Sequence, residues 1–250
     1  WRPLRNRRPL CILTLSLLSI VFIANYVSMK AKQVYDKLIS EGILNSRGNI
    51  TFSLGGRSVL VESRDSVGNL LQNWFEDWLG EHFPSARPNK NSQEFPDIFL
   101  NPISDETDLL EVKTFDIERG PGFDIANFDS YCNSLTTKSY RLDSDYLIFA
   151  YRMEGSKIEI TNIWLKKVWE IAGPSGTYPL KVQEKKSIIY NIRPVIWYST
   201  RSRFLPFNSK TAFLDALNET RYKYPKTHYT NAHWKRLVDE NISEYIRLKP

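Results

Sequence analysis

Residues 95–100 of this chain are Phe-Pro-Asp-Ile-Phe-Leu, and residues 109–115 are Leu-Leu-Glu-Val-Lys-Thr-Phe. Both runs are short and apolar, and the turn-forming residues 101–106 separate them, so the pattern predicts two successive strands with a hairpin-length connection. Because side chains alternate along a strand, Glu111 and Lys113 point to one face and Val112 to the other. If the two strands pair, Asp97 comes near Glu111 across the sheet.

Two carboxylates and a lysine grouped in this way predict a site for a hard divalent cation. Mg²⁺ prefers oxygen ligands, keeps several waters and commonly takes one or two carboxylates plus a phosphate oxygen. Such an ion polarises a phosphoryl group and activates its bound water, and the lysine can orient that water or neutralise developing charge. The reaction that suits this arrangement is phosphodiester hydrolysis. An exposed strand edge on which Glu111 and Lys113 form an ordinary ion pair is the alternative that these residues leave open.

The remaining chain alternates helical and strand patterns, which predicts one α/β domain with a mixed central sheet over residues 29–250. Apolar residues recur at three-to-four spacing in a helix over 67–79, as Val67, Leu70, Leu71, Trp74, Trp78 and Leu79. A first helix is expected soon after Met29, and further helices are expected over 124–135, 211–220 and 232–242. Residues 164–169 are expected to contain the start of another helix. Other expected strands are 50–54 and 58–62 as a hairpin, 146–151 as a buried strand, 157–165 and 188–198.

Composition excludes several classes of protein. The 250 residues are 42% hydrophobic and include 11 glycines and 2 cysteines, so a disordered chain, a collagen-like repeat and a disulfide scaffold are ruled out. The formal net charge is +6, with 34 Lys and Arg against 28 Asp and Glu. Four of the basic residues are Arg2, Arg5, Arg7 and Arg8, which leaves 30 against 28 in the remainder, so a DNA partner would need a local basic groove.

Residues 1–28 differ from the rest of the chain. They contain the four arginines, no acidic residue, and an uncharged apolar run over 10–27. Our preferred interpretation is sequence upstream of a start at Met29, and the alternative is a signal peptide or membrane anchor. We expect a cytoplasmic protein in the first case and a membrane-anchored or exported one in the second. Cys132 stands alone after Cys11, which agrees with a reducing compartment.

The motif and its surroundings resemble a known nuclease core. Pro96-Asp97 with Glu111-Val112-Lys113, between two helices and before a buried strand, resembles the catalytic core of the PD-(D/E)XK nucleases. The body of the chain further resembles the NgoBV/NlaIV type II restriction endonucleases. The stretches that carry this resemblance are 48–50 (GNI), 54–56 (LGG), 67–69 (VGN), 99–102 (FLNP), 108–113 (DLLEVK), 121–126 (PGFDIA), 145–149 (DYLIF), 164–169 (WLKKVW) and 192–194 (IRP).

The resemblance implies a restriction-endonuclease-like core and a function. Asp97 and Glu111 would bind Mg²⁺, Lys113 would be the catalytic lysine, and Glu76 or Gln72 on the preceding helix would complete the metal shell. The implied activity is cleavage of double-stranded DNA within GGNNCC, with a cognate DNA methyltransferase that protects the same site in the host. Because that site is a palindrome, we expect a two-fold homodimer in which each subunit reads one half-site.

Residues that read DNA are less distinct in the sequence. The basic residues in polar segments that could contact phosphates or bases are Lys138, Arg141, Lys185, Lys186, Arg201 and Arg203. The tryptophans Trp164, Trp169 and Trp197 favour core or dimer interface over base stacking. Two competing hypotheses remain open: a PD-(D/E)XK nuclease of repair or recombination, and a membrane-tethered DNA-binding protein that is no enzyme.

Overall fold

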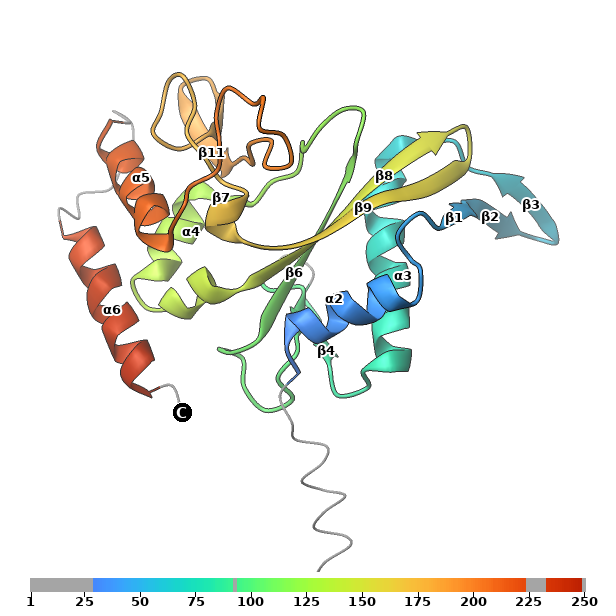
Figure 1. Ribbon diagram of the computed structural model, residues 1–250, viewed down its shortest axis with the longest axis horizontal. Coiled ribbons are helices and arrows are strands. Elements are labelled where there is room, and N and C mark those ends of the chain that lie inside the picture. Colours follow the sequence, from blue (N-terminus) through green and yellow to red (C-terminus); the bar gives the residue numbers. More distant parts are fainter. Residues whose placement is uncertain (1–28, 92–93, 224–232, 249–250) are drawn as a thin grey trace, which may run out of the picture.

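A six-stranded mixed sheet with the order β1-β9-β8-β6-β5-β4 forms the centre of the fold (Figure 1). The computed structural model describes residues 29–91, 94–223 and 233–248. The strands of this sheet are β1 (Arg47–Asn49), β4 (Arg87–Pro88), β5 (Ile98–Phe99), β6 (Leu109–Asp116), β8 (Asp145–Glu154) and β9 (Lys157–Lys167). β6 and β8 pair in parallel, with Glu111 opposite Tyr146, whereas the other neighbouring strands pair antiparallel.

Two smaller sheets lie outside the central one. β2 (Thr51–Leu54) and β3 (Arg57–Leu60) form a hairpin that projects from the body at the right of Figure 1. The predicted hairpin is therefore confirmed. β7 (Ala126–Asn127), β11 (Ile188–Ile192) and β10 (Val182–Lys185) form a three-stranded antiparallel sheet.

Helices cover both faces of the central sheet. The helices of the described residues are α2 (Ala31–Ser40), α3 (Val67–His82), α4 (Phe128–Leu135), α5 (Lys210–Lys223) and α6 (Trp234–Leu248). Short 3₁₀ turns add η1 (Arg64–Ser66), η2 (Ser139–Asp143) and η3 (Val168–Glu170). In Figure 1, α2 and α3 lie on one side of the sheet, and α4, α5 and α6 lie on the other. Within the described ranges, no helix is both long and apolar enough to cross a membrane.

Alternation along the two parallel strands divides the core into two clusters. Leu147 and Phe149 of β8 pack on the side of α2 and α3, whereas Tyr146 and Ile148 pack on the side of α4, α5 and α6. Because β8 is buried on both faces, its sequence is continuously apolar, as the buried strand over 146–151 predicted. The predicted α/β architecture with a mixed central sheet is confirmed.

Helix α3 buries a different stripe from the one that its spacing predicted. Leu70 and Trp74 are 40% and 39% exposed, whereas Phe75, which the predicted stripe omitted, is fully buried. Phe75 packs on Phe149 of β8, with 5.7 Å between the ring centroids. The strip of a helix that a sheet covers is narrower than the apolar surface of this helix, so Leu70 and Trp74 remain at its rim.

Two element boundaries differ from the predictions because of particular residues. The helix predicted over 124–135 begins only at Phe128, because Asn127 caps it by accepting a hydrogen bond from the Ser130 N–H at 3.0 Å. The strand predicted over 188–198 ends at Ile192, shortly before Pro194, which has no N–H for a sheet hydrogen bond.

Two further predicted elements are corrected by strand pairing. The strand over 95–100 contracts to Ile98–Phe99, since only these residues pair with β6. The helix start within 164–169 is wrong, because β9 stays paired with β8 to Lys167 and only the turn η3 follows.

We expect Leu79→Ala to lower the free energy of unfolding by about 2–5 kcal/mol, because Leu79 is 1% exposed and its loss leaves a cavity. Leu70→Ala on the same helix is the matched control and should cost less than about 1 kcal/mol. Urea denaturation at one protein concentration measures both. Equal losses would show that the helix is not oriented as described.

Candidate active site

Pairing of β5 with β6 brings Asp97 and Glu111 together. Ile98 lies opposite Leu110, so Asp97, one residue before β5, faces the start of β6. The Val112 N–H donates to Asp97 Oδ2 at 2.7 Å, and the Asp97 N–H donates to Glu111 Oε2 at 3.3 Å. The proximity of the two carboxylates that strand pairing predicted is therefore present in the structure, and Val112 packs on the opposite face.

Lys113 completes the group from the same face of β6. Its Nζ donates to Glu111 Oε1 at 2.8 Å, and Glu111 is only 6% exposed. The alternative of an exposed ion pair on a strand edge is thus incorrect, because this pair is buried. An ion pair removed from water costs desolvation energy, so its retention here points to function rather than stability.

Burial shifts all three pKa values. Burial raises the pKa of the Asp97 carboxyl, although Lys113, the Val112 N–H and Gln72 act in the opposite direction. Burial and the Asp97 charge raise the pKa of Glu111 against the influence of Lys113. Burial alone would lower the pKa of Lys113, but Glu111 and Asp97 reverse this effect and raise it. Lys113 is therefore a cation at neutral pH beside two carboxylates that lack sufficient compensating charge.

Of the two candidates on α3, Gln72 is the one that reaches the cavity. Gln72 Nε2 lies 3.5 Å from Asp97 Oδ1 and donates to Glu76 Oε1 at 3.1 Å. Gln72 lines the cavity that contains the three motif residues, whereas Glu76 is joined to Asp97 only through Gln72. A role for either residue in holding a metal stays a prediction.

The cavity is about 450 Å³ and opens between β6, α3, α4 and η2. Asp97, Glu111 and Lys113 form one part of its lining. The other polar side chains that line it are Gln72, Glu94, Asp124, Asn127, Ser130, Tyr131 and Arg141. Its residues come from segments far apart in the chain, so most of them could not be selected from the spacing of one motif.

Asp124 is a residue of this cavity that the sequence did not single out as a site residue. It adds negative potential at Lys113 and is itself paired with Arg193, with Asp124 Oδ1 2.8 Å from Arg193 Nε. Its place in the 121–126 stretch of the family resemblance was the available indication. Pairing with Arg193 leaves it a weaker candidate for a metal than Asp97 or Glu111.

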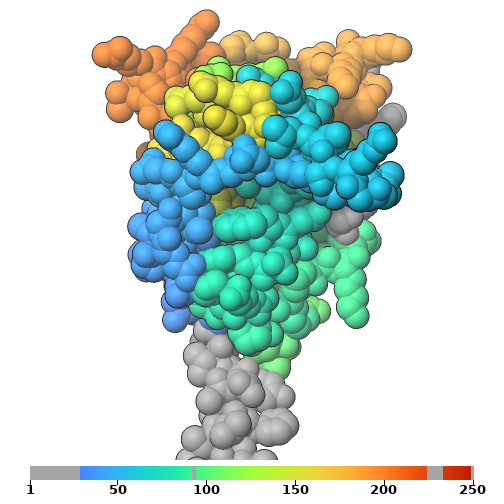
Figure 2. All heavy atoms as spheres, turned by 90° about the vertical axis from the view of Figure 1, so that its right-hand side faces the viewer, coloured from blue at the N-terminus to red at the C-terminus, as the bar shows by residue number. Residues whose placement is uncertain are grey.

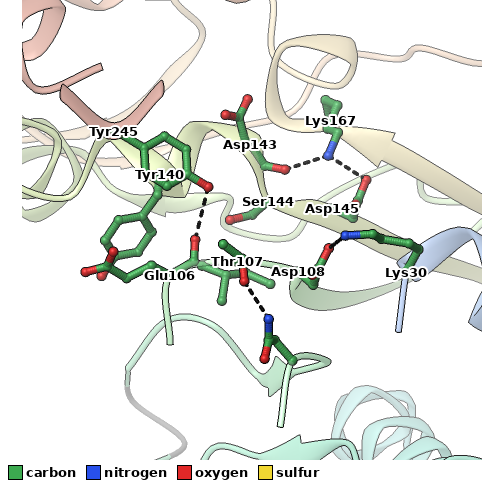
Figure 3. Close-up of a pocket in the computed structure, with 12 residues that line it drawn as sticks. Lys30, Glu106, Thr107, Asp108, Tyr140, Asp143, Ser144, Asp145, Lys167 and Tyr245 are labelled. Atoms are coloured by element: carbon green, nitrogen blue, oxygen red, sulfur yellow. Dashed lines mark hydrogen bonds and ion pairs between the residues drawn. The ribbon is translucent and has the colours of Figure 1, made fainter. Parts of the chain in front are cut away.

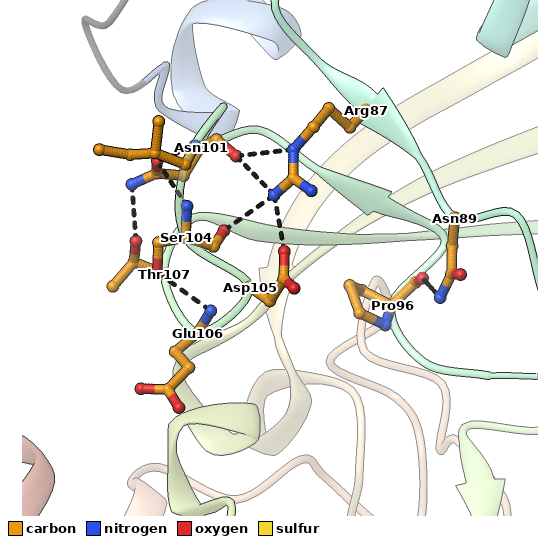
Figure 4. Close-up of polar contacts among 9 residues, drawn as sticks. Arg87, Asn89, Pro96, Asn101, Ser104, Asp105, Glu106 and Thr107 are labelled. Atoms are coloured by element: carbon orange, nitrogen blue, oxygen red, sulfur yellow. Dashed lines mark hydrogen bonds and ion pairs between the residues drawn. The ribbon is translucent and has the colours of Figure 1, made fainter.

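A polar network supports the loops on either side of Asp97 (Figure 4). The Asn89 side chain donates to the Pro96 carbonyl at 2.9 Å, and the Asn89 N–H donates to the Asp97 carbonyl at 2.7 Å. Arg87 donates to the carbonyls of Asn101 and Ser104 in the loop between β5 and β6. These bonds stabilise the backbone that carries Asp97, although the loop has little regular structure.

The structure separates the six predicted DNA-contacting residues. Only Arg141 lines the cavity, and the other five are exposed. Lys138 directly precedes η2. Lys185 and Lys186 lie at the turn between β10 and β11, and Arg201 and Arg203 lie in the loop after β11. The β10–β11 turn and this loop are in the upper part of Figure 1. Trp164 and Trp197 pack with Phe115 and Tyr198, as the core interpretation of the tryptophans predicted.

The comparisons with known proteins now identify the family. A family model described as NgoBV restriction endonuclease matches residues 28–248. The chain belongs to the NgoBV restriction endonuclease family. The type II restriction enzyme NlaIV of Neisseria lactamica is 39% identical over 222 residues, which cover 88% of this chain and 91% of that enzyme. The type II restriction enzyme NgoBV of Neisseria gonorrhoeae is 33% identical over 162 residues, which cover 64% of this chain and 93% of that enzyme.

A solved structure agrees with this assignment. The structure of the NlaIV restriction endonuclease has a TM-score of 0.83 and 37% identity, covering 90% of this chain and 92% of that one. Members of the NgoBV family are type II restriction enzymes, so this chain is a site-specific endonuclease that acts on DNA, and the non-enzymatic hypothesis is wrong. Type II restriction endonucleases generally use divalent metal ions. Residues 1–28, on which the anchor alternative depends, lie outside the described residues.

We expect Asp97→Asn to raise the melting temperature of the metal-free protein at neutral pH. Burial raises the pKa of this carboxyl, so its ionised form destabilises the folded state. A raised folded-state pKa means that stability increases as pH falls through that pKa towards the ordinary value, because the folded state then binds the extra proton. The Asn variant should lose that part of the pH dependence. Thermal melts in EDTA from about pH 4, near the ordinary pKa of an aspartate, up to neutral pH measure it. If the melting temperature of the Asn variant depended on pH as that of the parent does, burial would not destabilise the ionised form of Asp97.

Proposed function

We propose that this enzyme hydrolyses phosphodiester bonds of double-stranded DNA within GGNNCC, with Mg²⁺ as its metal and as a homodimer. The observation that carries the proposal is the buried group of Asp97, Glu111 and Lys113 around one cavity in a chain of the NgoBV family. The target sequence is carried over from the family resemblance. Because such an enzyme would also cut its own host's DNA, the proposal includes a cognate DNA methyltransferase that protects the same site, and it places the enzyme in the cytoplasm.

The residues of the cavity fit a divalent cation. Asp97 and Glu111 each keep carboxylate lone pairs beyond those used by the hydrogen bonds described above, and burial without enough positive charge raises both pKa values. In the described part of the chain, no three His, Cys, Asp or Glu side chains form a metal cluster. Mg²⁺ suits this limited set, since it commonly takes one or two carboxylates and completes its shell with water and phosphate oxygens.

Asp97, Glu111 and Lys113 would have different roles in phosphodiester hydrolysis. When bound, the cation would polarise the phosphoryl group and supply an activated water. Asp97 and Glu111 would hold it, with Gln72 restraining Asp97 from the side of α3. Lys113 lies on the same face of β6 with its Nζ 2.8 Å from Glu111 Oε1, where it would provide positive charge for the charge that develops on the phosphoryl oxygens.

A second copy of the chain is proposed from the symmetry of the target. A palindrome presents the same half-site twice, and a two-fold dimer reads both with one surface. The projecting hairpin supports this proposal, because Phe52, Leu54 and Val59 share one of its faces and are 56%, 73% and 57% exposed. Two-stranded hairpins are marginally stable alone, so a partner for this face is expected.

A groove that could accept the hairpin of a second copy lies next to the hairpin. An apolar groove of about 390 Å³ is lined by Ile50, Leu71, Trp74, Ile158 and Ile160, among other residues. Figure 2 looks onto this side of the molecule, where the hairpin lies between the yellow tip of β8 and β9 and the teal helix α3. The exposed rims of α3 at Leu70 and Trp74 are consistent with coverage by a second copy.

We expect Asp97→Ala and Glu111→Ala each to reduce cleavage by at least about 10³-fold, because each removes a ligand of the proposed metal. Phage DNA is digested with Mg²⁺ and with EDTA, and the fragment ends are sequenced. Glu76→Ala is the comparison, and a milder loss would separate it from the two motif residues. Discrete fragments from Asp97→Ala, or cleavage in EDTA, would overturn the metal assignment, and ends without GGNNCC would overturn the target.

We expect Val59→Asp to convert a dimer to a monomer, because it places a charge in the apolar face of the hairpin. Ser58→Asp is the matched control on the opposite face and should remain dimeric. Sedimentation velocity at a fixed protein concentration distinguishes the two. A dimeric Val59→Asp would exclude the hairpin as the interface, and a monomeric parent protein bound to a whole site would exclude the proposed dimer.

A further inference from the structure

Arg141 differs from the other cations near the catalytic cavity. It extends from η2 into the same cavity as Asp97, Glu111 and Lys113. Its guanidinium carbon lies 4.5 Å from the centroid of the Phe95 ring and 6.0 Å from that of Tyr131. Its Nε is buried and has no hydrogen-bond partner within the described part of the chain. Two aromatic rings thus restrict a guanidinium whose donors remain free.

Four other cations near Arg141 are paired with carboxylates. Lys113 is bonded to Glu111, and Arg193 Nε lies 2.8 Å from Asp124. On the other side of η2, a cavity of about 500 Å³ contains Lys30 and Lys167, which lie 2.7 and 2.8 Å from Asp108 and Asp145 (Figure 3). Among residues 29–91, 94–223 and 233–248, no carboxylate lies within ion-pair distance of Arg141.

The carboxylates of the cavity, Asp97, Glu111 and Asp124 among them, lie beyond ion-pair distance of Arg141, and the side chains directly beside it are uncharged. The hydroxyls of Tyr131 and Tyr146 are also buried without a hydrogen-bond partner in the described residues. Hydroxyls can donate hydrogen bonds to an anion but cannot neutralise a guanidinium. A half-buried cation without a partner is unfavourable, so its retention in a cavity indicates an anion that arrives from outside.

We infer that Arg141 binds a nonbridging oxygen of the phosphodiester that is cleaved. This inference rests on the proposed phosphodiester hydrolysis and names the residue that positions its substrate. A guanidinium is planar and matches a phosphate with two parallel N–H···O bonds, which a lysine ammonium cannot do. The Phe95 ring, 4.5 Å from the guanidinium carbon, restricts the position of the guanidinium in the cavity. The other predicted DNA-contacting residues are exposed, so they could contact only phosphates or bases away from the cleaved bond.

A neutral phosphate tests the inference directly. Two duplexes carry the mapped cleavage sequence, one unmodified and one with a methylphosphonate at each scissile position. Affinity is measured in EDTA, and again with Ca²⁺ where the unmodified duplex stays intact. In each condition, the affinity ratio of the unmodified to the methylphosphonate duplex should be on the order of tenfold larger for the parent than for Arg141→Gln, since the variant lacks one charge-assisted hydrogen-bond pair to the phosphate. The comparison between the two proteins cancels the effect of Asp97, Glu111 and the cation on that ratio, and this difference in ratio is the discrimination due to Arg141.

The control is Arg203→Gln. Arg203 also lies beside an aromatic ring, 5.0 Å from the centroid of Phe204, but it is exposed and does not line the cavity. This variant should keep the full discrimination whatever its overall affinity. Arg141→Lys, which retains the charge, should keep part of it and serves if the Gln variant does not fold. The inference would be overturned if Arg141→Gln discriminated between the two duplexes as strongly as the parent does. If the Gln variant does not fold, a folded Arg141→Lys with the same discrimination as the parent would overturn it instead. A parent enzyme that does not cleave DNA would instead overturn the proposed function.

Discussion

The hydrogen bond from the Val112 N–H to Asp97 Oδ2, 2.7 Å long, is the contact on which the site depends. β5 has only two paired residues, so sheet pairing alone holds Asp97 weakly. The carboxylate itself bonds the backbone of β6 and thereby ties the loop to the strand that carries Glu111 and Lys113. The buried Val112 N–H is satisfied by the carboxylate that we propose as a metal ligand, so the same side chain would serve both folding and chemistry.

The two-sided core explains why charged side chains can gather at this site. β6 and β8 are buried on both faces, and their apolar side chains stabilise the sheet independently of the charged group. Glu111 and Lys113 lie at the start of β6, where the cover of α4 and η2 leaves a cavity instead of packed side chains. Desolvation there raises the carboxyl pKa values, which makes the site unfavourable when empty and receptive to a cation.

Local patterns predicted the parts whose periodicity is strong. The buried strand around Tyr146, the hairpin of β2 and β3 and the alternation at Glu111, Val112 and Lys113 all follow from spacing that packing did not override. The orientation of α3 could not be predicted in the same way. Its apolar surface is wider than the strip that β8 covers, so the spacing of Leu70 and Trp74 resembles that of truly buried residues such as Phe75.

The sequence by itself determined which residues come together: strand alternation and one short connection place Asp97, Glu111 and Lys113 near one another, but leave open whether the group is buried or exposed. Only the tertiary structure decided what surrounds that group. Gln72, Asp124 and Arg141 come from three different segments, and their convergence on one cavity depends on how α3, α4 and η2 pack on the sheet. Packing likewise decides whether a basic residue lines the cavity or faces solvent, which is why Arg141 could not be distinguished from Lys138 or Arg203 in the chain alone.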